Sequence, residues 1–266
     1  MHVLLLRHPG TWLAGDMAPE DRREAESLFH LLESALTDVA ISLALFEQAR
    51  VASRAEAAPE RGNRGRPDIA EQTVRARYEV ALSAEKDPET TWSMAMATSE
   101  ELRAEVQLAR WEAGEVPRSY RHRLPFLYAK AFTYALDTIA KTLRTLRNLE
   151  GAPQAAGAAC DAFDQAFPQL VDVRNSAHHP EDRVRGKGPK GQLIDLRPIV
   201  NDVINAPGGG VLVIDQLIND RYGGTLADGS YGEVEVSLRS ATLAQHAVQA
   251  ALDAWTWRGW PRMEPS

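Results

Sequence analysis

The strongest regular pattern in the chain lies in residues 124–149, where large apolar residues alternate at intervals of three and four. The pattern is carried by Phe132, Leu136, Ile139, Leu143 and Leu146. This spacing places the side chains along one stripe of an α-helix, the kind that packs against other helices in a bundle. Gly151 follows and suits a helix end. The pattern predicts a long core helix and a fold made mainly of helices.

Residues 19–54 show the same helical spacing and predict a second long helix, beginning at Pro19. Shorter helices are expected over 68–84, over 99–113 and from 154 to 180, and residues 56–68 are expected to form an exposed loop. Within the last of these helices, Pro168 would bend or restart the chain and Pro180 would end it. These segments predict a helical bundle over 19–182, after an N-terminal extension of residues 1–18.

The residues after 190 have a different character. The segments "GGGVLVIDQLIND", "RYGGTLADG" and "SYGEVEVS" predict short strands, with turns at Asn219–Asp220 and Asp228–Gly229. Residues 240–257 return to a helical pattern. Three tryptophans in the tail "WTWRGWPRMEPS" are expected to cover the core rather than to bind a ligand. The predicted fold class is therefore mainly α, with residues 183–266 forming a basic loop, a small antiparallel β meander and a final helix.

Charge and cysteine content limit the classes of function. The net charge is −7, so the chain as a whole does not attract nucleic acid and any basic surface has to be local. Cys160 is the single cysteine, which excludes an internal disulfide and a cysteine-built metal site, and its small neighbours indicate a buried residue.

The N-terminal apolar run Val3–Leu6 is shorter than the roughly 7–15 apolar residues of a secretory signal. No segment is expected to reach the length of about 18 apolar residues that a membrane span needs. We therefore expect a soluble, cytoplasmic protein with no membrane segment.

The segment "VDVRNSAHHPEDR", residues 171–183, combines side chains that suit phosphate chemistry. Arg174 offers a permanently charged planar guanidinium to phosphoryl oxygens, and a histidine can transfer a proton near neutral pH. Arg174 and His179 would lie about 140° apart around a regular helix and about 7.5 Å apart along it. They can therefore meet only near a helix end, which Pro180 would supply, or across two copies of the helix. Asn175 could fix the tautomer of a histidine ring.

Residues 174–179, "RNSAHH", resemble the signature of the HEPN superfamily, which is an arginine, a polar residue, three residues and a histidine near the end of a late bundle helix. The resemblance covers residues 120–182, and the N-terminal helices by type alone; the strands after 190 lie outside it. Many HEPN proteins are metal-independent endoribonucleases of toxin–antitoxin or phage-defence systems, and they usually dimerise with two motifs facing one cleft. The resemblance implies a HEPN-like fold, a homodimer, RNA as substrate, an antitoxin or defence-system partner, and no cofactor or metal.

By position, the resemblance assigns a role to each catalytic candidate. Arg174 would bind or polarise the scissile phosphate, and His179 would be the acid/base group for attack by the ribose 2′-hydroxyl. Asn175 would orient these groups. His178 stands where the family usually has a small or apolar residue, so which histidine acts stays open.

The segment "RVRGKGPKG", residues 183–191, carries four cations and no acid. These cations are Arg183, Arg185, Lys187 and Lys190. As a flexible loop beside a phosphate site, the segment could follow an RNA backbone with salt-sensitive affinity. Alternatively, it is a solvated linker to the strands.

Other interpretations of the motif stay open. The chain could be a non-catalytic module that binds RNA, nucleotides or a protein. Arg174 could instead pair with an acid such as Asp172 or Asp182, which would leave the histidines solvated. A metal site is not expected, because zinc and iron usually need three spaced ligands and Glu181 lies beyond the proline.

The opening segment "HVLLLRHPG" suggests a separate alternative. It resembles the Arg-His-Gly motif of the histidine phosphatases, with Arg7 and His8 in place but Pro9 before Gly10. That fold needs alternating strands and helices, which residues 19–180 do not predict. The other interpretation of this segment is an extension or an edge strand.

Overall fold

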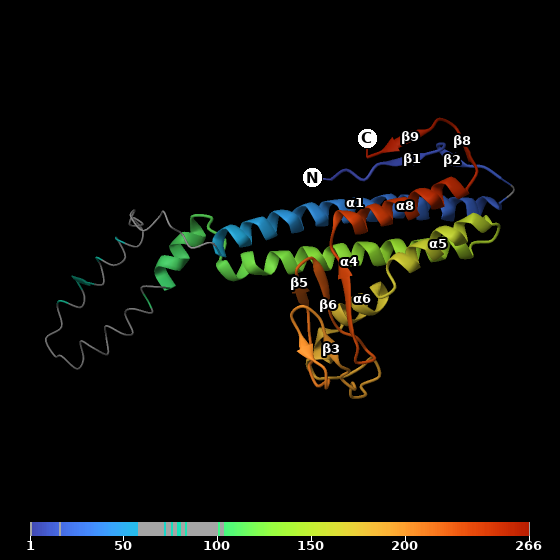
Figure 1. Cartoon of the computed structure of the whole chain (residues 1–266). Helices are drawn as coiled ribbons and strands as arrows, with labels where there is room; N and C mark the ends of the chain where they lie inside the picture. Colours follow the sequence, from blue (N-terminus) through green and yellow to red (C-terminus); the bar gives the residue numbers. More distant parts are fainter. Residues whose placement is uncertain are drawn as a thin grey trace. The chain divides into compact units, whose positions relative to one another are not determined.

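The computed structural model of the chain describes residues 2–15, 17–57, 72, 76, 79–80, 83, 101 and 104–265 (Figure 1). The described part is mainly helical with small antiparallel sheets, as predicted. The chain divides into two compact units, one of residues 1–49 and 124–266 and one of residues 50–123. The boundary predicted at residue 182 is not one of these divisions. Strands that follow residue 182 pack against α6 (Leu170–His178), a helix of the predicted bundle. The candidate site lies wholly in the first unit.

The unit of residues 50–123 contains the last turns of α1 (Pro19–Ala57), a helical segment at 104–112 and the first residues of α4 (Arg118–Asn148). The helix predicted over 99–113 is present where the structure describes it. Most of the loop predicted at 56–68 lies outside the described residues. The helix predicted over 68–84 is described only at residues 72, 76, 79, 80 and 83, which are helical.

The two long helices α1 and α4 provide most of the core of the first unit. The buried seam of α1 consists of Ala25, Phe29, Leu32, Leu36, Val39, Leu43 and Phe46. The buried seam of α4 consists of Ala129, Phe132, Leu136, Ile139, Leu143 and Leu146. Both seams alternate by three and four, which keeps one face of each helix towards its neighbours. They join one hydrophobic core with α5 (Gln154–Ala166), α6 (Leu170–His178) and α8 (Leu238–Ala254).

The helix that carries the motif is short and bounded by prolines. Pro168 lies in the turn between α5 and α6, which confirms the predicted restart. The helix α6 ends at His178, before Pro180, as predicted. Pro180 then becomes the first residue of α7 (Pro180–Val184), a short helix that the sequence analysis did not predict.

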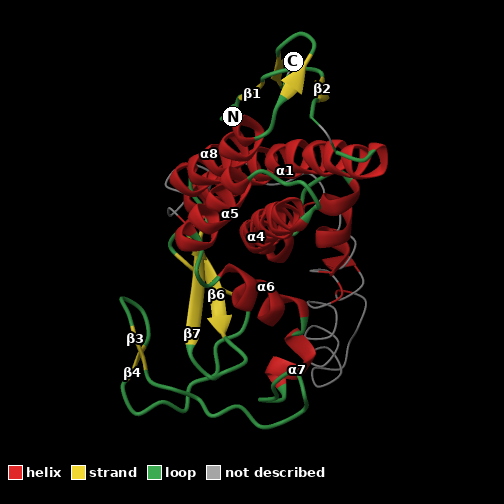
Figure 2. Cartoon of the chain, turned by 90° about the vertical axis from the view of Figure 1, so that its right-hand side faces the viewer, coloured by secondary structure: helices red, strands yellow, loops and turns green. Residues whose placement is uncertain are grey.

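The predicted meander is present and packs against α6. It consists of β5 (Gln216–Ile218), β6 (Arg221–Thr225) and β7 (Tyr231–Glu235), paired antiparallel in that order. The turn residues Asn219 and Gly229 have φ angles of 54° and 84°, in the left-handed region that such turns need. The strands β6 and β7 lie beside α6 (Figure 2). A further pair, β3 (Ile199–Val200) and β4 (Asn205–Ala206), precedes them.

The N-terminal extension pairs with the C-terminal tail. The strand β1 (Leu6–His8) pairs antiparallel with β9 (Arg262–Glu264), and β2 (Trp12–Leu13) pairs with β8 (Trp257–Arg258), so the two termini lie close together (Figure 1). The sequence analysis did not predict this pairing.

The tail tryptophans have different environments. Trp255 is buried edge-on against Phe29, as expected for a residue that covers the core. Trp260 is 86% exposed and covers nothing. The final helix α8 ends at Ala254, earlier than predicted, so these aromatic residues follow the helix.

The hydropathy of α1 differs from the expectation that no segment reaches the length of a membrane span. Among the described residues α1 is the one helix that is long and apolar enough to cross a membrane, whereas no such segment was expected. Half of its most apolar 18-residue window is buried inside the structure. Core helices of soluble proteins and signal sequences share this composition, so the property alone identifies neither.

Candidate functional site

Arg174 lies in the middle of α6 and is fixed by a carboxylate from α4. Its Nε lies 2.9 Å from Oδ2 of Asp137, whose side chain is 4% exposed, and Arg174 itself is 23% exposed. Its Nη1 donates to Oδ1 of Asn175 at 2.9 Å. The acid partner is therefore neither Asp172 nor Asp182. Asn175 orients the guanidinium, and not a histidine ring as the sequence suggested.

Two cations share the buried carboxylate of Asp137. Lys141 Nζ lies 2.6 Å from the same Oδ2 that contacts Arg174. The three side chains together carry one excess positive charge. Nη2 of Arg174 has no partner among the residues that the structure describes, and this side chain keeps contact with solvent. The group could therefore accept an anion such as a phosphate, which would bind to the free N–H groups.

Tyr134 connects Arg174 with His178. The guanidinium carbon of Arg174 lies 5.8 Å from the centroid of the Tyr134 ring, within the range of a cation–π contact. The Tyr134 Oη lies 3.2 Å from Nδ1 of His178. Burial raises the pKa of Tyr134; Arg174 acts against this, but Asp137 and Asp215 raise the pKa further. The hydroxyl therefore stays protonated at neutral pH.

A polar stripe on α4 supplies most of these supporting groups. Lys130, Tyr134, Asp137 and Lys141 follow one another at intervals of four, three and four, beside the apolar seam of the same helix. Lys130 Nζ donates to the carbonyl oxygen of Ala177 at 2.8 Å and thereby holds the last turn of α6. The sequence analysis missed these residues, although a polar stripe with the same period as the core seam was a signal that could have found them.

The two histidines are in contact but have different surroundings. Their ring centroids lie 4.9 Å apart, edge to face. His178 is the last residue of α6, whereas His179 has left the helix, with φ −119° and ψ 56°. Nδ1 of His179 lies 3.5 Å from Oε1 of Glu181, and both side chains are exposed. In the described part of the chain, no contact joins Arg174 to His179.

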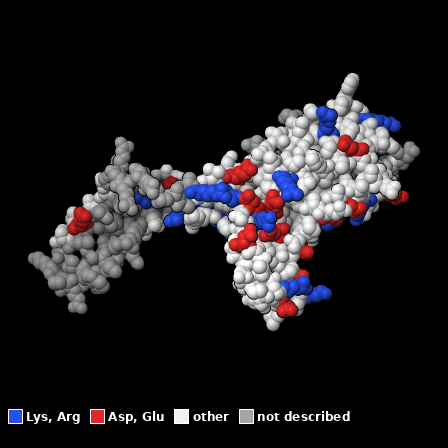
Figure 3. Space-filling view, in the orientation of Figure 1, with Lys and Arg blue, Asp and Glu red and all other residues white. Residues whose placement is uncertain are grey.

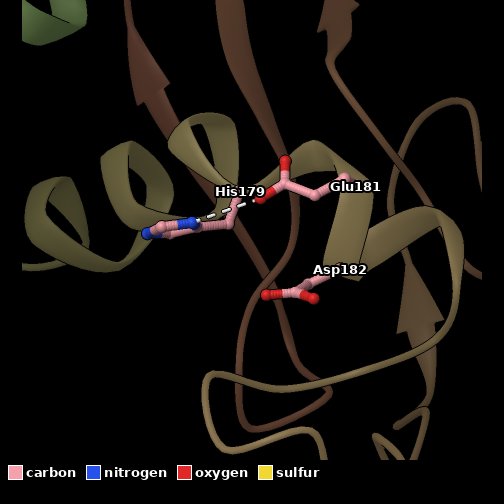
Figure 4. A group of neighbouring side chains, drawn as sticks. All are labelled: His179, Glu181 and Asp182. Atoms are coloured by element: carbon pink, nitrogen blue, oxygen red, sulfur yellow. Dashed lines mark ion pairs between the residues drawn. The ribbon is translucent and has the colours of Figure 1, made fainter.

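His179 also forms a group with two acids (Figure 4). The potential ligand atoms of His179, Glu181 and Asp182 lie within 4.8 Å of one another. From the sequence, Glu181 was expected to lie away from His179, because it follows the proline. In the structure, α7 begins at Pro180, and its acids Glu181 and Asp182 lie close to His179. A hydrogen bond from its own backbone N–H, with a smaller contribution from His179, lowers the pKa of Glu181. The ligand types suit a divalent cation, but His179 and Glu181 are exposed and we assign no metal to the group.

The basic segment 183–191 is partly folded into the protein. Arg183 is 2% exposed and donates to Ser176 Oγ at 3.2 Å and to the carbonyl oxygen of Lys187 at 2.5 Å, so it cannot face RNA. Lys187 is half-buried and forms a β-bridge with Leu193. The segment is thus a hydrogen-bonded loop and not the flexible one that was expected.

The other cations of this segment lie on a surface that also carries acids. Arg185 and Lys190 of this segment are exposed. On the face seen in Figure 3, basic and acidic side chains are intermixed over the first unit. Any contact with a nucleic-acid backbone on this face would therefore be local.

The N-terminal Arg-His pair does not form a phosphatase-like site. Arg7 is exposed and His8 is 2% exposed, on opposite faces of β1. His8 Nε2 lies 2.7 Å from Oε1 of Glu33, which Arg262 also contacts at 2.8 Å. The segment is an edge strand bound to the tail, which was the second of its two interpretations.

An open groove lies between α1 and α4 and includes Tyr134 in its lining. It has a volume of about 520 Å³ and is lined by α1 and α4 side chains that include Ile41, Leu127 and Tyr134. Neither this groove nor a larger hollow of about 770 Å³ near Glu20 and Glu150 is lined by a residue of the motif. Tyr134 is thus the link between the groove and the candidate site.

The sequence matches no protein-family model and no curated protein, and no solved structure matches the fold.

Proposed function

We propose that the chain is a HEPN-type, metal-independent endoribonuclease that acts as a homodimer. The observation that supports this most is a solvent-accessible guanidinium, Arg174, which a buried carboxylate fixes at a helix end, with Tyr134 in contact with both Arg174 and His178. Arg174 and a histidine are the reactive groups; position in the motif points to His179, and the neighbouring His178 leaves the choice between the two open. The resemblance of residues 174–179 is the basis for RNA as the substrate.

The reaction needs one anion-binding group and one group that transfers a proton. The ribose 2′-oxygen forms a bond to the adjacent phosphorus while the P–O5′ bond breaks. The 2′-hydroxyl proton passes to a histidine, and O5′ takes up a proton from the imidazolium, which leaves a 2′,3′-cyclic phosphate and a 5′-hydroxyl. Arg174 stabilises the charge that develops on the phosphoryl oxygens. The histidine acts first as a base and then as an acid.

Three further parts complete the proposal. The chain acts in the cytoplasm, which the short N-terminal apolar run supports. By the resemblance, a second copy places the two motifs at one cleft, and an antitoxin or another defence-system protein controls the activity. Arg185 and Lys190 are the exposed cations next to the motif that would contact the RNA backbone. Arg183 is not included, because it is buried.

A non-catalytic module that binds RNA, nucleotides or a protein is the second candidate. The observation in its favour is the lack of a contact between Arg174 and His179 in the described part of one copy. In this case Arg174 would bind a phosphate without any proton transfer.

Incubation of the purified protein with mixed RNA in EDTA separates the two candidates. We expect 2′,3′-cyclic phosphate ends, and we expect Arg174→Ala and the double variant His178→Ala/His179→Ala each to lower the rate by about 100-fold or more. Arg147→Ala and His246→Ala are matched controls at exposed positions of the same unit and should retain the activity. Light scattering should show the same dimer for every variant.

Two results would contradict the proposal. Cleavage that stops completely in EDTA would exclude the metal-independent mechanism. RNA binding without any cleavage by the unaltered protein would support the non-catalytic module.

A further inference from the structure

We propose that Tyr134 is a positioning residue for His178, and that His178, not His179, transfers the proton at the Arg174 site. The inference rests on the proposed ribonuclease function and selects between the two histidines that the motif leaves open.

Tyr134 touches both reactive groups. Its ring faces the guanidinium of Arg174 at 5.8 Å, and its Oη lies 3.2 Å from Nδ1 of His178. One side chain therefore sets where the imidazole lies relative to the guanidinium. His179 has no contact with Tyr134 or Arg174 among the described residues, and its Nδ1 is directed to Glu181 instead.

The hydrogen bond to Tyr134 bears on which nitrogen of His178 carries the proton. If Nδ1–H donates to Tyr134 Oη, then Nε2 keeps its lone pair and can accept the proton of a 2′-hydroxyl. The resulting imidazolium keeps the same Nδ1–H bond and can give the Nε2 proton to O5′. One fixed hydrogen bond thus serves both halves of the reaction. Burial and the nearby acids raise the pKa of Tyr134, so its neutral oxygen remains available as the acceptor.

Side chains of α4 hold the C-terminal end of α6 in place. Lys130 binds the carbonyl oxygen of Ala177, the residue before His178, and Asp137 binds the side chain of Arg174. Together with Tyr134, these contacts hold the backbone, the imidazole and the guanidinium from one helix. Such support from neighbouring side chains is what keeps reactive groups in a productive geometry. His179, beyond the helix end, has no comparable support in the described structure.

Nuclear magnetic resonance of protein labelled with ¹⁵N-histidine tests the positioning directly, without any RNA. We expect His178 to carry its proton on Nδ1 in the unaltered protein. Tyr134→Phe should change the ratio of its two tautomers by about fivefold, as expected for the loss of one hydrogen bond. Tyr128→Phe is the matched control on α4, since Tyr128 lines the same groove and has no contact with the motif among the residues that the structure describes. An unchanged His178 ratio in Tyr134→Phe would overturn the positioning role.

Cleavage assays on single variants test which histidine reacts. His178→Ala should lower kcat by about 100-fold or more, whereas His179→Ala should retain most of the activity. Tyr134→Phe should lower kcat by about five- to tenfold with little change in KM. Loss of activity in His179→Ala but not in His178→Ala would refute the choice. An unaltered protein that cleaves no RNA would overturn the proposed function and the role of His178 in proton transfer, and the tautomer ratio would still decide whether Tyr134 positions the ring.

Discussion

Replacing Asp137 by alanine should destabilise the first unit more than the loss of any ordinary surface acid. The Asp137 carboxylate is 4% exposed and pairs with Arg174 at 2.9 Å and with Lys141 at 2.6 Å. Without it, the two cations repel each other, and the partly buried guanidinium loses its counter-charge. The substitution therefore tests whether the polar stripe of α4 holds α6 in place.

The magnitude follows from the burial of the three groups. Removing one partner of a fully buried ion pair costs about 3–5 kcal/mol. Arg174 is 23% exposed and Lys141 is 51% exposed, so solvent screens both cations and reduces the expected loss to about 2 kcal/mol. A loss of this size lowers the unfolding temperature by about 4–8 °C in a protein of this length.

Asp161→Ala is the matched control. Asp161 also lies in a helix and pairs with an arginine, Arg147, but the two side chains are 65% and 39% exposed. Its removal should cost less than about 1 kcal/mol, and any gain in helix propensity is common to both variants. Unfolding in urea, followed by circular dichroism, gives the two free energies. Equal losses for both variants, or a coupling energy near zero in an Asp137→Ala/Arg174→Ala double-mutant cycle, would refute the reasoning.

Three further predictions concern other parts of the chain. Burial raises the pKa of Glu33, but His8 and Arg262 lower it more, so the pKa in the folded protein is below the ordinary value. The unaltered protein should therefore lose stability as the pH falls below about 4.3 and then through the lower pKa of the folded state. Glu33→Gln should lose less stability over the same pH range, as measured by unfolding in urea. Gly229→Ala should destabilise more than Gly191→Ala in thermal unfolding, because both positions have positive φ but only the Cβ at Gly229 would collide with the Asp195 carbonyl oxygen. Cys160 is 1% exposed and burial raises the pKa of its thiol, so a thiol reagent at pH 8 should label it only at the rate of unfolding, measured by mass spectrometry.

The helices and the meander could be predicted because their signals are local. The apolar residues of α4 repeat at the spacing of a helix seam, and each residue from Phe132 to Leu146 in that pattern is buried. The turns at Asn219 and Gly229 have residues that adopt positive φ readily, so their positions could be identified without tertiary information.

The partners within the site could not be predicted, because they depend on contacts between distant segments. Asp137 precedes Arg174 by 37 residues, and only the packing of α4 on α6 selects it over the nearer acid Asp172. The burial of Arg183 depends on Ser176 and on the fold of the loop that follows it. A charged residue in a glycine-rich segment suggests a solvated side chain, and composition alone does not reveal an internal hydrogen-bond partner.

The pairing of β1 with β9 has a consequence for synthesis on the ribosome. Leu6 cannot find its partner Glu264 until the intervening chain has been translated. At about 5–20 residues per second, this delay is on the order of 13–52 s. During that time the edge of the nascent strand has no partner from its own chain, and such an edge can pair with other polypeptides. Chaperones that bind extended segments would therefore meet β1 before its partner strand β9 has been made.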